Sequence, residues 1–269
     1  MSAPIGWVAG KNDSLVTIIE KLGLKTNLKL CLDAGDINSY SGSGIKWLDT
    51  SGNGYDFDFG DGSTSSTYPT FNGSAGGLSA SEYFSFDGGD YFTYDSSYEA
   101  WMNTLHNAGI SVSVLLVATA ASGVNYWFST GVNTITPGVS LHTYLAGDKY
   151  VFEWSVYNTP VGLSTLSLSF DALYGRPPDK LAVLGFSNTE NSGTTCIPLV
   201  KGITQSPTAS VLGTSNSNTM GTFRIGARGD GTNFLINGAK LSGLAIWVGT
   251  QLTSAQLQSI ANALQRRFK

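Results

Sequence analysis

The stretch from Thr219 to Ala261 constrains the fold of this chain more than any other part of the sequence. Apolar side chains alternate with polar or small ones around Phe223–Ile225 and again over Leu244–Val248, the period-two pattern of half-buried strands. A loop rich in Gly, Asp and Asn separates these two segments. Thr253 and Gln256 then have the spacing of a capping box, which predicts a closing helix. Its predicted buried stripe comprises Leu257, Ile260, Ala261, Leu264 and Phe268.

Short alternating segments also fill the rest of the chain from Leu28 onward. Charged residues make up only 13% of the 269 residues and 33 are glycines, which is typical of many short strands joined by tight turns. Further strands are predicted at 82–87, 91–94, 110–116, 126–130, 139–144, 150–157, 163–170, 181–186 and 194–203, with a helical turn at 99–107. Residues 60–80 indicate a surface loop. This spacing predicts an all-β sandwich or barrel.

Residues 1–27 differ from the remainder, so we expect an N-terminal arm followed by one β-domain over 28–269. Asp13 or Ser14 can cap a short apolar helix that stops at Gly23. Two interpretations are open for this arm. It covers one end of the core, or it docks the protein onto a larger body.

The net charge and the distribution of apolar residues argue against several classes of function. A net charge of −4 and a pI near 5.1 argue against a nucleic-acid partner, which requires a basic surface. The start, Met1-Ser-Ala-Pro-Ile-Gly6, lacks the regions of a secretory signal, and no apolar stretch reaches membrane-spanning length, so we expect synthesis in a cytoplasm without membrane insertion. Cys31 and Cys196 either form one disulfide or stay unpaired, and the absence of an oxidising compartment favours two thiols.

Four segments, in this order, carry a family resemblance: Leu30–Gly35, Trp47–Gly54, Phe84–Tyr91, and Phe223–Arg228 continued through Leu257. Over about residues 28–265 the chain resembles the LamG-like branch of the concanavalin A-like lectin/glucanase superfamily. The resemblance implies a two-sheet antiparallel jelly-roll sandwich with short N-terminal and C-terminal helices. It also implies similarity to phage- or prophage-encoded virion surface proteins.

Catalysis by the family mechanism is not expected. Glucanases of this superfamily place carboxylates on one strand in a Glu-x-Asp-x-x-Glu order, so that nucleophile and acid share one face. The five glutamates are Glu20, Glu82, Glu99, Glu153 and Glu190, and none begins such a motif. Glu153 alone lies deep in a strand pattern, and we interpret it as an outward residue. His106 and His142 lack neighbours at zinc-ligand spacing.

Three sequence features are candidates for binding sites. Trp127, which follows a Gly-containing turn, is the first aromatic to test as a platform for a sugar, although most aromatics are expected in the core. Aspartates at strand ends suit calcium, but tight turns demand the same residues, so no cofactor is predicted. Arg228-Gly229-Asp230 spells an integrin-binding tripeptide, which chance produces often. The four candidate calcium ligands are Asp33, Asp36, Asp87 and Asp90.

Together these observations predict a non-catalytic surface module of a phage virion, of decoration, head-fibre or tail-fibre type. We expect several copies, anchored to capsid or tail proteins through residues 1–27, with loops that contact glycans or the host envelope. One alternative is a carbohydrate-active hydrolase or lyase on the same fold. Another is a purely structural decoration protein without a ligand.

Overall fold

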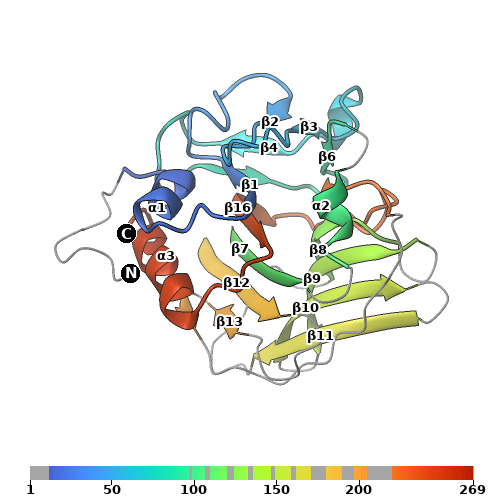
Figure 1. Ribbon diagram of the computed structural model, residues 1–269. Helices are drawn as coiled ribbons and strands as arrows, with labels where there is room; N and C mark the ends of the chain where they lie inside the picture. Colours follow the sequence, from blue (N-terminus) through green and yellow to red (C-terminus); the bar gives the residue numbers. More distant parts are fainter. Residues whose placement is uncertain are drawn as a thin grey trace.

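The computed structural model describes residues 12–96, 99–106, 110–119, 124–132, 136–146, 149–158, 162–170, 180–189, 197–200, 202–204 and 220–268. Two antiparallel sheets stack face to face, and helices flank one of them (Figure 1). This architecture confirms the predicted all-β sandwich. No helix among the described residues is long and apolar enough to cross a membrane.

Sheet A is built around two long central strands, β7 and β16, which pair with each other. In spatial order it contains β14 (Ile203–Thr204), β13 (Ile197–Val200), β12 (Ala182–Thr189), β7 (Ser111–Thr119), β16 (Lys240–Val248), β5 (Tyr83–Ser85) and β4 (Thr70–Asn72), while β1 (Leu28–Asp33) also pairs with β16. The β4 strand corrects the expected loop over 60–80, because Phe71 packs against the core beside β5. The 3-10 turn Ser65–Thr67 lies in the same segment.

Sheet B faces sheet A across the main core. Its spatial order is β11 (Gly162–Phe170), β10 (Lys149–Asn158), β9 (Gly138–Ala146), β8 (Asn125–Ser129), β15 (Arg224–Ile225), β6 (Phe92–Tyr94), β3 (Phe57–Phe59) and β2 (Lys46–Trp47). The strand expected over 194–203 is instead two strands, β13 and β14. They meet at Gly202, whose φ of 74° is a left-handed conformation that glycine adopts without strain.

Two apolar clusters explain why the strands of sheet A are more hydrophobic than those of sheet B. The first fills the space between the sheets. The second lies on the outer face of sheet A, under α1 (Leu15–Lys21) and α3 (Ser254–Gln265). Because both of its faces are covered, β7 carries an unbroken apolar run from Val114 to Val117. The short α2 helix (Ala100–Asn103) contributes Trp101 and Met102 to the first cluster.

The closing helix matches its prediction. Thr253 caps α3 by accepting from the amide of Gln256, and the reciprocal half of the capping box is also present. Leu257, Ile260, Ala261 and Leu264 are fully buried against sheet A, and Phe268 is partly buried there. The α3 stripe therefore seals the outer face of that sheet.

The N-terminal helix belongs to the same layer. Ser14 caps α1, and Leu15, Ile18 and Ile19 are buried in the second cluster, with α1 lying beside α3 (Figure 1). Trp247 in β16 also holds the segment after α1 against sheet A, because its indole N–H donates to the carbonyl of Leu24 at 2.7 Å. The apolar side of α1 is thus covered by the chain itself. Docking of the arm onto another body stays a prediction, and residues 1–11 lie outside the described residues.

Candidate functional site

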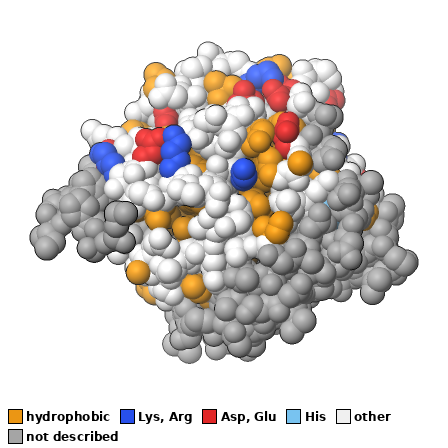
Figure 2. All heavy atoms as spheres, viewed as in Figure 1, with side chains coloured by type: hydrophobic (Ala, Val, Ile, Leu, Met, Phe, Trp, Pro, Cys, Tyr) orange, Lys and Arg blue, Asp and Glu red, His pale blue; other side chains and the backbone are white. Residues whose placement is uncertain are grey.

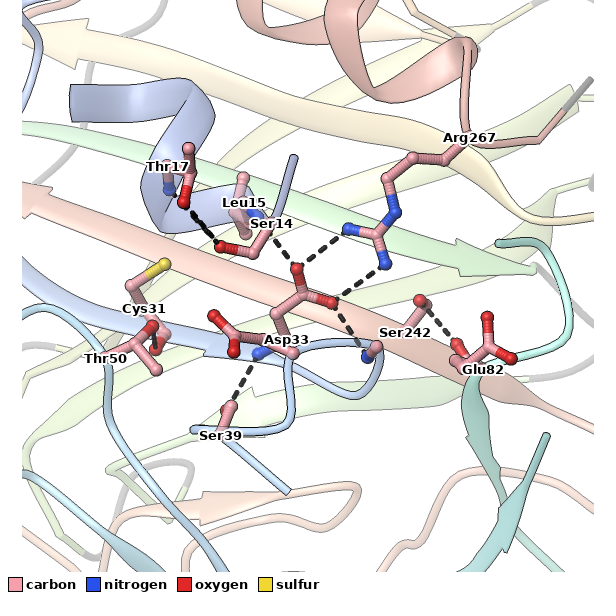
Figure 3. A network of polar contacts seen from close by, with 12 residues as sticks. Ser14, Leu15, Thr17, Cys31, Asp33, Ser39, Thr50, Glu82, Ser242 and Arg267 are labelled. Carbon is pink, nitrogen blue, oxygen red and sulfur yellow. Dashed lines mark hydrogen bonds and ion pairs between the residues drawn. The ribbon is translucent and has the colours of Figure 1, made fainter. Parts of the chain in front are cut away.

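The aspartate expected at the end of β1 is the centre of a buried ion pair. Arg267 donates to the carboxylate of Asp33 through Nη1 at 2.8 Å and Nη2 at 3.0 Å, and both residues are at most 3% exposed (Figure 3). The backbone amides of Leu15 and Gly35 donate to the same carboxylate at 2.8 and 2.9 Å. Asp33 therefore joins α1, β1 and the C-terminal end of α3, and its charge is balanced by the guanidinium of Arg267.

The other three candidate calcium ligands also serve their own turns. Asp36 accepts from the amide and side chain of Asn38, and Asp87 accepts from the amide of Gly89. Asp90 accepts from the amide of Asp87 at 2.8 Å, and burial raises the pKa of Asp90 to about 6. Within the described residues no three His, Cys, Asp or Glu side chains gather as a metal ligand set. The four aspartates therefore do not form one shared set of carboxylate ligands.

Trp127 was wrongly predicted as a sugar platform. It is fully buried between the sheets, and its indole N–H donates to Oγ1 of Thr143 at 3.1 Å. A register shift between Tyr126 and Phe128 explains this position, since the bulge directs both Trp127 and Phe128 into the core. The other tryptophans with described side chains, Trp47, Trp101 and Trp247, are buried as well, as expected for most aromatics.

The carboxylates offer no pair of the glucanase type among the described side chains. Glu153 lies in β10 as predicted, at the register position between His142 and Ser167. Glu82 is buried and accepts from the backbone amides of Ser74 and Ser79, so it holds a turn. Absence of catalysis stays a prediction.

Two further sequence features have structural roles. Cys31 is a fully buried free thiol, and Cys196 lies outside the described residues. In the tripeptide of residues 228–230, Arg228 donates to both carboxylate oxygens of Asp230, at 3.1 and 2.7 Å. The two charged ends thus pair with each other, and this pairing lowers the pKa of Asp230.

The outer face of sheet B has a different character from that of sheet A. A row of register positions crosses all eight strands and is polar throughout: Lys46, Asp58, Thr93, Arg224, Ser129, Ser140, Ser155 and Thr165. The adjacent row, Phe59, Phe92, Ile225, Phe128, Leu141, Trp154 and Leu166, is apolar throughout. Its described side chains lie in the main core, so the polar row belongs to the outer face.

Aromatic rings accompany the polar row in two places. Tyr126, His142 and Tyr144 stack in series, with ring centroids 5.1 and 5.9 Å apart, but His142 is only 7% exposed. Tyr91 and Phe234 form a second stack, with centroids 5.8 Å apart and planes inclined by 27°. Both rings of the second stack are half-buried, so this pair reaches the surface.

We call the set Asp58, Tyr91, Thr93, Arg224 and Phe234 the Arg224 face. The guanidinium of Arg224 lies 5.7 Å from the centre of the Tyr91 ring, and its Nη1 donates to the carbonyl of Gly229. At the edge of the sheet Lys46 bridges Asp58 and Asp95, at 3.2 and 2.6 Å. Figure 2 shows Lys or Arg side chains among carboxylates at the top of the view, where Figure 1 places β2 and β3.

Sequence reasoning missed the Arg224 face because its members are far apart in the chain. In the sequence alone Arg224 is a polar residue of an alternating strand, and Tyr91 begins the strand predicted at 91–94. The available signal was the Gly/Asp/Asn loop after Arg224, since loops next to sheet faces often carry binding residues. Only the register of β6, β15 and β3 brings the set together.

No family model and no curated protein matches this sequence. Solved structures do match in fold. The binding domain of botulinum neurotoxin serotype C1 gives a TM-score of 0.59 at 13% identity, over 90% of this chain and 53% of that one. A structure of botulinum neurotoxin type C, whose cell entry depends on two ganglioside molecules, gives a TM-score of 0.60 at 12% identity. The match covers 90% of this chain and 52% of that one. Trypanosoma rangeli sialidase in complex with sialic acid gives a TM-score of 0.53 at 10% identity, over 91% of this chain and 34% of that one.

At these identities the similarity establishes the fold alone. This chain spans about half the length of the toxin domains and a third of the sialidase. The matches therefore place the protein among two-sheet antiparallel sandwiches. They match the fold that the sequence resemblance implied, without naming a family.

Proposed function

We propose that the protein is a non-catalytic glycan-contacting module and that the Arg224 face is its contact surface. The main support for this proposal is the difference between the outer faces of the two sheets. Among the described residues α1 and α3 seal the outer face of sheet A, whereas the outer face of sheet B carries the polar row and the half-buried rings of Tyr91 and Phe234. An aromatic ring beside hydrogen-bonding side chains suits a sugar, which has apolar C–H faces and a polar rim.

The solved structures with the same fold support this proposal. One belongs to a toxin whose cell entry depends on two ganglioside molecules, and another is a sialidase in complex with sialic acid. The absence of a paired-carboxylate motif in the sequence supports a binding role over hydrolysis. Asp58, which belongs to the polar row, and Asp95 are both engaged by Lys46.

The test is binding to a glycan array by wild type, Tyr91→Ala and a matched control. Tyr83 in β5 is the control, because it lies under a cation, Lys240, at 4.7 Å but belongs to sheet A. Loss of a central aromatic contact weakens binding roughly tenfold or more. We expect that loss for Tyr91→Ala and none for Tyr83→Ala. Equal binding by all three proteins would contradict the assignment of the surface.

We further propose display in many copies on the outside of a phage virion, where weak glycan contacts gain avidity. The LamG-like resemblance of the four sequence segments, which implies similarity to virion surface proteins, supports this. Mass spectrometry of purified particles tests it, together with deletion of residues 1–11. That deletion spares Leu15, Ile18 and Ile19, whose burial the fold needs. Absence of the intact protein from particles overturns the virion role, and full incorporation of the truncated chain overturns anchoring through residues 1–11.

A further inference from the structure

Tyr55 is a half-buried aromatic residue that lies just before β3. Its ring packs against the main core, with its centroid 5.3 Å from that of Trp101 and 6.3 Å from that of Tyr94. Its backbone amide donates to the carboxylate of Asp49 at 3.2 Å. These contacts hold the ring in place, while part of the side chain stays exposed to solvent.

Glu99, which directly precedes α2, places a half-buried carboxylate near this ring. Its Oε1 accepts from the hydroxyl of Tyr94 at 2.9 Å. Oε2 of Glu99 and the hydroxyl of Tyr55 make no hydrogen bond within the described residues, and both atoms reach solvent. A ligand from outside can therefore contact both atoms without displacing any part of the fold.

The charge of Glu99 has no counter-charge in the part of the chain that the structure describes. The nearest candidate by strand order, Lys46 in β2, is already engaged by two aspartates. The pKa of the Tyr55 hydroxyl is raised, first by burial and then by the charges of Glu99 and Asp49. The hydroxyl thus lies in a negative potential, which favours a positively charged ligand.

An aromatic ring next to an accessible carboxylate oxygen suits an ammonium group on a small ring. The aromatic ring attracts the cation and covers apolar C–H groups, while the carboxylate accepts from N–H. Asp49 is not available for this role, because it already accepts from the amides of Cys31, Ser51 and Tyr55 and from the hydroxyl of Ser51. One free carboxylate oxygen is too few for a calcium ion, which needs six to eight oxygen ligands.

We propose that Tyr55 and Glu99 form a second glycan subsite, which selects a sugar with a free amino group. The ammonium donates to Oε2 of Glu99, and the ring and hydroxyl of Tyr55 contact the sugar ring and one of its hydroxyl groups. An N-acetylated sugar lacks the charge that Glu99 attracts. This inference rests on the proposed glycan-contacting role, and it adds a position outside the Arg224 face and a ligand class.

The first experiment uses the wild-type full-length protein and matched ligands. A glucosamine oligosaccharide is compared with its N-acetylated form by calorimetry at low and moderate salt. A charge-assisted hydrogen bond predicts roughly tenfold to hundredfold tighter binding of the free amine, with a smaller difference at the higher salt. Equal affinity of the two forms overturns the amine subsite. A lysine peptide that binds as tightly as the glucosamine oligosaccharide overturns its assignment to a sugar.

The second experiment places the subsite. Glu99→Gln keeps an acceptor for Tyr94 and removes the charge, so it should abolish the preference for the free amine. Tyr55→Ala should weaken the binding of both ligands roughly tenfold. Glu20→Gln is the matched control, because it removes the same charge from an exposed carboxylate and should leave the preference intact. A preference that survives in Glu99→Gln contradicts the assignment.

Tyr91→Ala separates this inference from the proposed function. It removes a ring of the Arg224 face and should leave the preference for the amine unchanged. If Tyr91→Ala abolishes that preference, the amine binds at the Arg224 face and the subsite at Tyr55 and Glu99 is wrong. Unchanged array binding by Tyr91→Ala contradicts the Arg224 face alone, and no binding of any glycan by the wild type overturns both proposals. A thermal melt of each variant separates loss of binding from loss of fold.

Discussion

The buried ion pair between Asp33 and Arg267 provides the sharpest stability prediction. Arg267→Met leaves a carboxylate that is 1% exposed with only two backbone amides as donors. Breaking a buried pair by removing one partner costs about 3–5 kcal/mol, because the remaining charge stays buried. For a chain of this size each kcal/mol lowers Tm by roughly 2–4 °C, so the melt should fall by roughly 6–20 °C.

The assay is urea unfolding of both single variants and the double variant. Asp33→Ala should be as costly as Arg267→Met, since it leaves the guanidinium buried, and the double variant should cost less than the sum. Lys25→Met is the matched control. It removes an exposed partner of Glu20, whose contribution is about 0–1 kcal/mol. A loss below about 1 kcal/mol for Arg267→Met would mean that the C-terminal end is not fixed to β1.

Three further predictions concern the closing helix, catalysis and pH. Leu257→Ala and Ile260→Ala, both in fully buried positions, should each cost about 2–5 kcal/mol in urea unfolding, whereas an unchanged melt would mean that α3 is detached. The wild-type protein should release no reducing sugar from β-glucans or galactans, and turnover that disappears in Glu153→Gln would establish an enzyme instead. The pKa of Asp90 is raised above its ordinary 3.8 to about 6, so the folded state binds this proton more tightly than the unfolded state. Stability should therefore fall as pH rises from about 4 to about 6, and Asp90→Asn should flatten that slope; an identical slope in the variant refutes the role of Asp90.

Patterns that are local in the sequence predicted their structures well. The capping box of α3 needs only Thr253 and Gln256, and its apolar stripe repeats within twelve residues. The strands of sheet B follow the same logic, because alternation of polar and apolar residues already defines their two faces. The predicted strand over 150–157, for example, corresponds to β10.

Features that depend on distant contacts could not be predicted in this way. Asp33 pairs with Arg267, which is 234 residues away in the chain. The residues around Asp33 therefore show only an aspartate at a turn and not its ion pair. Trp127 follows a Gly-containing turn, a position where an aromatic side chain is often exposed. The bulge in β8, which the sequence does not reveal, directs it into the core. The Arg224 face combines residues from β3, β6, β15 and the loop after it, and no single segment reveals that set.

Contact between glycans and the outer face of sheet B, at the Arg224 face, has a direct signature in backbone protection. Hydrogen exchange of the backbone amides with and without the tightest glycan from the array tests it most directly. We expect protection confined to residues 57–60, 91–95 and 224–235, with α1, α3 and sheet A unchanged. Protection over α1 and α3, with none at the Arg224 face, would contradict it.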